Sequence, residues 1–286
     1  MGFRASSTLS GERQRPKNAQ LVDSSRTSNA VELDAAGLRF DGYPAIDEIT
    51  FSVPDGQFVA IVGPTGCGKS SILNLVAGLL GPTSGPVRTS GRNVSGVNPD
   101  AAYMFQQDAL LPWKRVRDNV MLGPILRGAT PQSARDQARS WIDRVGLSGF
   151  DDRYPYQLSG GQRKRAAMAQ VLINGLPLLL MDEPFGALDV QTRALMENEL
   201  LELWRELGAT VLFVTRDLEE AISLSDRVLL LTAGPNSRLK ADYLIDLPRP
   251  RNVMEARFTP GFAELYETIW SALRTEVLES HARTRA

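Results

Sequence analysis

Residues 63–70 read Gly63-Pro64-Thr65-Gly66-Cys67-Gly68-Lys69-Ser70, which matches the phosphate-binding pattern G-x-x-x-x-G-K-[ST]. An apolar run over residues 57–62 precedes the match, and a helical apolar pattern over residues 72–76 follows it. In such a strand–loop–helix unit the glycines let backbone N–H groups turn toward phosphate oxygens, and the helix N-terminus adds a partial positive charge. We therefore expect a P-loop in which Lys69 reaches the terminal phosphates of a nucleotide and Ser70 binds magnesium. The alternative is a glycine-rich turn that binds no phosphate. The strand pattern before the loop and the helix pattern after it argue against this alternative. We interpret Cys67 as a residue that the loop tolerates and not as a redox residue.

The composition is that of an ordinary globular chain. The 286 residues are 43% hydrophobic and 23% charged, enough for one large domain with a satellite subdomain. A net charge of -1 gives no general field for nucleic acid, so we expect no nucleic-acid partner. The longest charge-free stretch, residues 70–87, is interrupted by Asn74 and several Gly and Pro residues, so no membrane-spanning helix is expected. One cysteine, Cys67, and one histidine, His281, exclude an internal disulfide, a zinc site in the core and a Ser-His-Asp triad.

Short apolar runs alternate with helical periodicity along the chain. The runs resemble buried strands of a mixed or parallel sheet and cover residues 49–53, 57–62, 178–181, 210–215 and 227–232. Between two of these runs, six apolar side chains fall on one helix face: Leu195, Met196, Leu200, Leu203, Trp204 and Leu207. The alternation predicts an α/β domain with crossover helices.

Three segments depart from this alternation. Residues 1–29 are rich in serine and basic residues and read as a disordered tail, whose start also matches a myristoylation pattern that we do not favour. Residues of about 105–162 predict a helical insertion, with Thr130 as N-cap, Pro131 in the first helical position and an apolar stripe of Trp141, Val145 and Leu147. Residues 251–286 predict a C-terminal helical extension with an amphipathic helix over about 260–277, carrying Phe262, Leu265, Ile269, Trp270 and Leu273.

An acidic pair, Asp182-Glu183, follows the apolar run 178–181. The pair therefore lies at the carboxyl end of a buried strand, where open α/β sheets bind nucleotides. Asp182 suits a magnesium shell, and Glu183 is placed to orient or deprotonate an attacking water. Two solvated acids at a strand end are the alternative, which the nearby P-loop makes less favourable.

Residues 158–162 read Leu158-Ser159-Gly160-Gly161-Gln162, a string expected by chance in only about a few chains per ten thousand. With the P-loop and the acidic pair, the chain resembles an ATP-binding cassette subunit of a transporter over about residues 31–250. The resemblance implies a P-loop NTPase (RecA-like) α/β core with a mixed or parallel sheet, an antiparallel β subdomain and the inserted α-helical subdomain. Ser159 and Gln162 also form an S-x-x-Q capping box, which alone explains them as a helix start.

The resemblance implies roles for individual residues. Glu183 acts as the catalytic base, and Gln106 in Phe105-Gln106-Gln107 is the Q-loop glutamine that senses magnesium and a membrane partner. Phe40 stacks on adenine, with Tyr43 as the alternative and a core role for Phe40 as the ordinary one. Magnesium is bound by Ser70, Gln106 and Asp182. The expected ATP contacts, some from a second cassette, are Phe40, Gly63, Pro64, Thr65, Gly66, Cys67, Gly68, Lys69, Ser70, Ser71, Ser159, Gly160, Gly161, Gln162 and the D-loop residue Asp189.

One position departs from the family. Where cassettes carry a histidine after the strand that follows the D-loop helix, this chain has Arg216 in Val214-Thr215-Arg216-Asp217. Arginine is always charged and offers five donors, which suits contact with a phosphoryl group. The side chain has the alternative of pairing with Asp217 or Glu219. We expect a working but slow ATPase, with a cassette that binds ATP without turnover as the alternative.

The sequences Leu110-Leu111-Pro112-Trp113 and residues 188–193 resemble the bacterial nitrate, sulfonate, taurine and bicarbonate importers. The resemblance implies a cassette dimer, permease subunits, a substrate-binding protein and a peripheral place on the cytoplasmic face of the bacterial inner membrane. A segment with Trp113 exposed beside Lys114 and Arg115 suits permease docking, and burial of Trp113 is the alternative. A non-transport ATPase of this superfamily is also an alternative, although only about 90 positions separate Lys69 from Ser159, too few for a long coiled coil.

Overall fold

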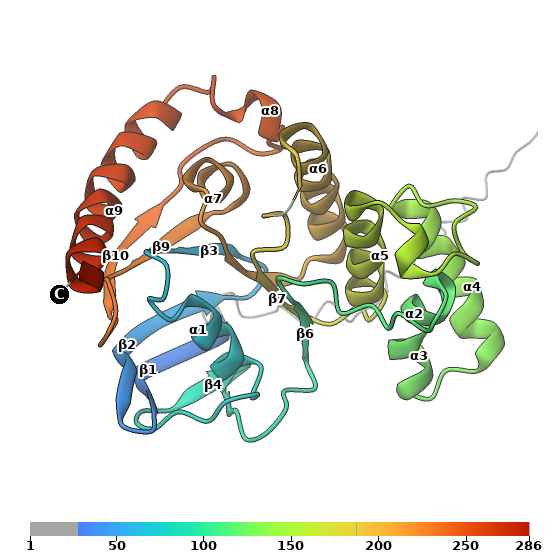
Figure 1. Cartoon of the computed structure of the whole chain (residues 1–286), viewed down its shortest axis with the longest axis horizontal. Coiled ribbons are helices and arrows are strands. Elements are labelled where there is room, and N and C mark those ends of the chain that lie inside the picture. The colour runs from blue at the N-terminus through green and yellow to red at the C-terminus, as the bar shows by residue number, and fades with distance from the viewer. Residues whose placement is uncertain (1–27, 187, 286) are drawn as a thin grey trace, which may run out of the picture.

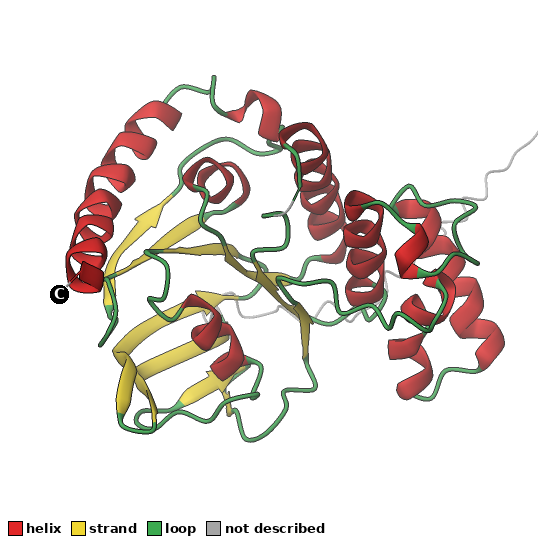
Figure 2. Cartoon of the chain, viewed as in Figure 1, coloured by secondary structure: helices red, strands yellow, loops and turns green. Residues whose placement is uncertain are grey.

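The computed structural model describes residues 28–186 and 188–285, without the side chains of residues 284 and 285. Two sheets and several groups of helices make up this part of the chain (Figures 1 and 2). The expected tail, residues 1–29, and its acylation pattern lie almost entirely outside the described residues. The first strand begins at Asn29, two residues before the predicted boundary.

A six-stranded sheet in the order β10-β9-β3-β8-β7-β6 forms the centre of the fold. Five neighbouring strands are parallel and β10 is antiparallel at one edge, which confirms the expected mixed sheet. Four predicted apolar runs lie on its strands. The strands are β3 (Phe58–Val62), β6 (Ala101–Met104), β7 (Leu178–Asp182), β8 (Thr210–Val214), β9 (Arg227–Leu231) and β10 (Leu239–Leu244).

A four-stranded antiparallel sheet packs beside the central one, as expected for the β subdomain. It has the order β2-β1-β4-β5, with β1 (Asn29–Phe40), β2 (Tyr43–Pro54), β4 (Val87–Thr89) and β5 (Arg92–Asn93). Helix α1 (Lys69–Val76) lies between the two sheets in Figure 1 and shares a hydrophobic cluster with both. The alternating side chains Val59 and Ile61 of β3 enter this cluster, whereas Ala60 and Val62 face the opposite layer.

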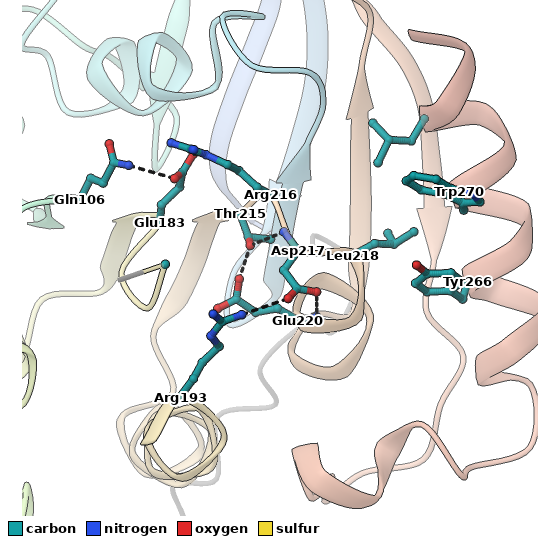
Figure 3. Close-up of a pocket in the computed structure, with 12 residues that line it drawn as sticks. Gln106, Glu183, Arg193, Thr215, Arg216, Asp217, Leu218, Glu220, Tyr266 and Trp270 are labelled. Atoms are coloured by element: carbon teal, nitrogen blue, oxygen red, sulfur yellow. Dashed lines mark hydrogen bonds and ion pairs between the residues drawn. The ribbon is translucent and has the colours of Figure 1, made fainter. Parts of the chain in front are cut away.

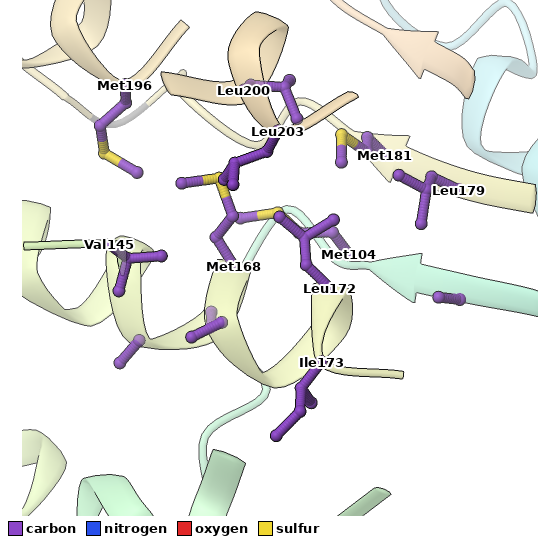
Figure 4. Packing of buried hydrophobic residues seen from close by; sticks show 14 of the residues in the cluster. Met104, Val145, Met168, Leu172, Ile173, Leu179, Met181, Met196, Leu200 and Leu203 are labelled. Carbon is purple, nitrogen blue, oxygen red and sulfur yellow. The ribbon is translucent and has the colours of Figure 1, made fainter. Parts of the chain in front are cut away.

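The predicted helical insertion is present at one end of the molecule. It contains α2 (Val116–Val120), α3 (Leu122–Leu126), α4 (Pro131–Arg144), the 3-10 turn Pro155–Gln157 and α5 (Gly160–Leu172). Thr130 caps α4 as predicted, accepting a hydrogen bond from the Ser133 amide. The predicted stripe needs correction, because Trp141 is only partly buried while Ile142 is fully buried. Figure 4 shows the cluster in which α5 and α6 (Val190–Leu207) pack against the strands β6 and β7.

The remaining helices lie in the C-terminal half of the chain. They are α6 (Val190–Leu207), α7 (Leu218–Leu224), α8 (Val253–Ala256) and α9 (Phe262–Arg285). Four side chains of the predicted α6 face are buried, whereas Leu207 is only partly buried. Leu195 is 49% exposed, because it precedes Met196 by one position and points off that face. Helix α9 is longer than expected, and Trp270 is 44% exposed instead of buried with Ile269. No helix among the described residues has the length and apolar character needed to cross a membrane.

Candidate nucleotide-binding and catalytic site

The P-loop curls around a buried lysine. It begins where β3 ends, and α1 begins at Lys69 with Gly68 as N-cap at φ 90°. Gly66 has a φ of 79°, and both conformations are ones that a side chain disfavours. The Lys69 ammonium donates hydrogen bonds to the carbonyl oxygens of Gly63 (2.8 Å) and Pro64 (2.9 Å). The loop backbone therefore has the concave shape that a phosphate requires.

Cys67 packs beneath the same loop. A Cβ added to Gly63 would lie 2.8 Å from Cys67 Sγ and 3.2 Å from the carbonyl oxygen of Leu231, so only glycine fits there. The thiol is fully buried, and this burial raises its pKa. A protonated, enclosed thiol is a poor nucleophile, which agrees with the interpretation of Cys67 as a tolerated residue of the loop.

Asp182 ends β7 beside the P-loop. Its side chain is buried, which raises the carboxyl pKa, and the hydroxyls of Ser70 and Tyr103 lie within hydrogen-bonding reach. Burial also raises the pKa of Tyr103, so this hydroxyl remains a donor. The donor set of Ser70, Asp182 and the Gln106 amide oxygen consists of the hard oxygen ligands that magnesium prefers. The described residues hold no cluster of three or more His, Cys, Asp or Glu side chains that could bind a metal ion.

Both carboxylate oxygens of Glu183 are held by side chains from neighbouring strands (Figure 3). Gln106 follows β6 and donates its amide Nε2 to Oε2 at 3.0 Å, whereas Arg216 follows β8 and donates Nε to Oε1 at 2.6 Å. Glu183 itself adopts a φ of 44°, a strained conformation for a residue with a side chain. Such strain at the end of a buried strand is typical of a functional position.

Arg216 does not make the alternative pairing with Asp217 or Glu219. Its guanidinium pairs with Glu183, not with Asp217 or Glu219, and this carboxylate raises the pKa of Arg216. Asp217 is already engaged, because it caps α7 by accepting from the Glu219 amide (2.9 Å) and also pairs with Arg193 (3.1 Å). The position that carries a histidine in the family is therefore tied to the expected catalytic base.

Two buried glutamates, one on α6 and one on α7, lie next to the loop that follows β8. The carboxyl groups of Glu197 and Glu220 are within hydrogen-bonding reach of each other, and Glu220 also accepts from the Thr215 hydroxyl. Burial raises the pKa of Glu197 to about 7 and that of Glu220 well above its usual range. Burial and the repulsion between two adjacent carboxylates thus both favour a proton shared by the pair.

The predicted capping box opens α5. Ser159 Oγ accepts from the Gln162 amide at 3.3 Å, and Gln162 Oε1 accepts from the Ser159 amide at 2.9 Å. A Cβ on Gly161 would lie 3.0 Å from Thr192 Cγ2, and the Thr192 amide donates to Asp189, which caps α6. The structure thus brings residues 159–162 close to the D-loop residue, while none of the hydrogen bonds found in the described segments joins them to the P-loop.

Basic residues that the sequence analysis missed connect this helix to the Q-loop. The buried Lys164 donates to the Gln106 carbonyl at 2.6 Å, and Arg163 pairs with Asp108 at 3.0 Å. Burial lowers the pKa of Lys164. Their position directly after Gln162 is a signal in the sequence, but their partners lie more than fifty positions away along the chain.

The expected adenine contact lies at the hairpin between β1 and β2. Phe40 and Tyr43 are register partners there, with exposed fractions of 44% and 57%. This exposure excludes the ordinary core role for Phe40. Stacking on adenine remains a prediction.

A groove of about 530 Å³ opens beside Glu183 and Arg216 (Figure 3). One wall is the loop after β8, and the other is α9, which contributes Tyr266, Trp270 and Leu273. Glu183 and Arg216 are therefore accessible from the side of the C-terminal helix.

A P-loop at a parallel sheet, an acidic pair at the end of β7 in the same sheet and a capped L-S-G-G-Q helix together define an ATP-binding cassette. Residues 46–186 match the family described as ABC transporter. The chain is 45% identical over 236 residues to an uncharacterised ABC transporter ATP-binding protein of Methanocaldococcus jannaschii, covering 82% of this chain and 86% of that one. The chain therefore belongs to the ABC transporter family as an ATP-binding subunit, and its activity is that of an ATPase.

Two further relatives have names that include a solute. The aliphatic sulfonates import ATP-binding protein SsuB of Ralstonia nicotianae is 44% identical over 240 residues, which is 84% of this chain and 80% of that one. The nitrate import ATP-binding protein NrtC of Synechococcus elongatus is 39% identical over 236 residues, which is 82% of this chain and 36% of that longer protein. A dimeric ATP-binding cassette solved in a post-hydrolysis state with ADP and Pi matches with a TM-score of 0.67 at 30% identity, covering 75% of this chain and 98% of that one. These likenesses confirm the expected fold class.

Proposed function

We propose that this ATPase powers the import of a small anion of the nitrate or sulfonate kind across a bacterial inner membrane. The names of two relatives support import of such an anion, and they do not favour a non-transport role. The proposed assembly contains a second cassette, permease subunits and a substrate-binding protein, with this chain on the cytoplasmic face.

The observation that carries the proposal is the position of Gln106. Its side chain holds Glu183, its carbonyl is held by Lys164 of α5, and its loop continues toward Trp113. A displacement of the loop by a membrane partner would therefore change the hydrogen bonding of the catalytic base. This physical link is what a transporter needs to couple hydrolysis to movement of its permease.

The surface around Trp113 suits such a partner. Trp113 is 72% exposed, so the alternative that it is buried in the helical subdomain is wrong. Leu110, expected to belong to the same anchor, is buried and supports the loop from below. Arg115 provides a charged rim, paired with Asp152 at 2.7 Å. An exposed aromatic side chain with a charged rim is typical of interface anchors, and we assign this surface to a short cytoplasmic helix of the permease.

The second cassette supplies what one chain lacks. The P-loop presents its N–H groups from one side only, and residues 159–162 lie at the start of a different helix. A head-to-tail pair would place the free N–H groups of α5 on the phosphate held by the partner's P-loop. The dimeric state of the matching solved cassette supports this arrangement.

Within that pair, Lys69 and the P-loop amides would hold the phosphates, and Glu183 would accept a proton from the attacking water. Magnesium, when bound by Ser70, Asp182 and Gln106, supplies positive charge to the phosphoryl oxygens. Each oxygen of Glu183 already accepts one hydrogen bond, so an attacking water has to compete with Gln106 and Arg216 for the carboxylate. We therefore expect a working but slow ATPase.

The test is transport in vesicles that contain the permease, with ATPase of the isolated chain measured in parallel. Trp113→Ala is expected to lower transport about tenfold or more, the usual loss for an interface anchor, and to leave ATPase of the isolated chain within about twofold. Phe258→Ala is the matched control, because Phe258 is a comparably exposed aromatic (79%) outside this surface. An equal loss of transport and ATPase in Trp113→Ala would contradict the docking role.

A further inference from the structure

The turn between β9 and β10 packs directly on the P-loop. A Cβ added to Gly234 would lie 3.1 Å from the carbonyl oxygen of Gly66 and 3.7 Å from Cys67 Cα. At the end of β9, the carbonyl oxygen of Leu231 would lie 3.2 Å from a Cβ added to Gly63, so this strand end also packs closely on the P-loop. The backbone of residues 231–234 thus supports the P-loop from the side away from β8.

Side chains of helix α9 hold this turn by hydrogen bonds to backbone groups of the turn. Glu276 is 5% exposed, and its Oε2 accepts a hydrogen bond from the Ala233 amide at 2.7 Å. Its Oε1 pairs with Lys240 of β10 at 2.6 Å, so both oxygens are engaged. Arg283, near the end of α9, donates Nη1 to the carbonyls of Ala233 (3.2 Å) and Gly234 (2.9 Å). One helix therefore binds an amide and two carbonyls of two adjacent residues in the turn.

These contacts connect the C-terminal extension to the nucleotide site. Figure 1 shows α9 running along the sheet edge formed by β10. Buried charged groups such as Glu276 are retained only where all their partners are fixed, so the turn has little freedom to shift. A rigid turn against Gly66 limits how far the P-loop backbone can open.

We infer that Glu276 and Arg283 are positioning residues for ATP: through the turn at Ala233–Gly234 they hold the P-loop in its phosphate-binding shape. A P-loop binds phosphate with backbone N–H groups, whose directions depend on the loop's conformation. A loop that is already ordered loses less entropy on binding, so removal of the support weakens ATP binding. The inference deepens the ATP-binding role of the P-loop and rests on it.

The experiment measures the affinity of the full-length chain for a fluorescent ATP analogue with magnesium, and the KM and kcat of its ATPase. Arg283→Ala and Glu276→Gln are each expected to raise Kd and KM about three- to tenfold, the effect of losing one or two hydrogen bonds, with kcat within about twofold. Arg283→Lys retains a donor and is expected to recover most of the affinity. Arg274→Ala is the control, because Arg274 is an exposed residue of the same helix.

Gly234→Ala perturbs the turn without touching α9. Its added Cβ presses on the Gly66 carbonyl and is expected to raise Kd in the same direction. A lower melting temperature with unchanged Kd in both Arg283→Ala and Glu276→Gln would overturn the inference, since it would show support of stability only. Weaker binding in Gly234→Ala alone would overturn the role of α9. Failure of the parent chain itself to bind ATP would instead overturn the proposed function.

Discussion

Replacement of Arg216 by histidine tests whether the ion pair with Glu183 slows the enzyme. The Nε–Oε1 distance is 2.6 Å, and the side chains are 59% and 13% exposed for Arg216 and Glu183. Gln106 occupies the other carboxylate oxygen. While both contacts persist, each oxygen has only one lone pair left for a water molecule.

The exposure of the pair sets the size of the effect. Exposed ion pairs contribute about 0.2–1 kcal/mol, and the largely enclosed Glu183 places this one near the upper end. Opening a contact of about 1 kcal/mol costs roughly a factor of five in the population of free Glu183. We expect Arg216→His to raise kcat roughly fivefold at about pH 8, where an unperturbed histidine is neutral.

The assay is steady-state ATPase at saturating magnesium-ATP, with Glu183→Gln as the background. Salt provides a second readout: between about 0.05 and 0.5 M, screening should raise the parent's kcat and leave that of Arg216→His nearly constant. Arg274→His serves as the control for an exposed arginine on another element. An unchanged or lower kcat in Arg216→His would refute the reasoning. If Arg216→Ala then fell to the background, arginine would instead be a direct donor to the phosphoryl group.

Three further perturbations address the rest of the site. Lys69→Ala is expected to weaken ATP binding by about two orders of magnitude or more, because it removes a buried charge from the loop, and retention of tight binding in calorimetry would contradict the P-loop assignment. Ser159→Arg is expected to leave the Kd of the monomer within about twofold and to prevent ATP-dependent dimers in light scattering, and dimers of normal stability would exclude residues 159–162 from the interface. The raised pKa of Glu197, about 7, stabilises the fold below its unfolded value near 4.5 and loses that contribution as pH rises through 7. Glu197→Gln should therefore flatten the fall in melting temperature between about pH 5 and 8, and a parent curve that is already flat would contradict a shared proton with Glu220.

Much of the fold could be predicted because its signals are local. The central strands are short apolar runs, and the P-loop needs glycines at fixed spacing for its two left-handed residues, Gly66 and Gly68. Capping of α4 by Thr130 and of α5 by Ser159 also depends on residues only three positions apart. The sequence positions of Leu195 and Trp270 gave the helix faces only approximately, because a residue at the margin of a stripe is buried or exposed according to what packs beside it.

Contacts between distant segments could not be predicted in this way. The hydrogen bond from Lys164 to Gln106 depends on how α5 docks beside β6, and nothing in the local pattern of either segment specifies that distance. The hold of Glu276 on Ala233 likewise depends on the path of the C-terminal extension along β10. The burial of Glu276 was especially difficult to predict, since a glutamate within an amphipathic helix is ordinarily solvated.

The partner of Arg216 shows how a local requirement decides a functional contact. Asp217 was a natural partner by proximity, but the first amides of α7 need an acceptor, and the side chain of Asp217 turns toward them. Arg193 then occupies its remaining oxygen from α6. With Asp217 engaged in both contacts, the nearest carboxylate left for Arg216 is Glu183, which the strained end of β7 presents on the neighbouring strand. The N-cap of a seven-residue helix thus directs a positive charge onto the proposed catalytic base. Asp217→Asn keeps this cap but removes its charge, and it would offer Arg216 no better alternative, because the amide carries no charge to compete with Glu183.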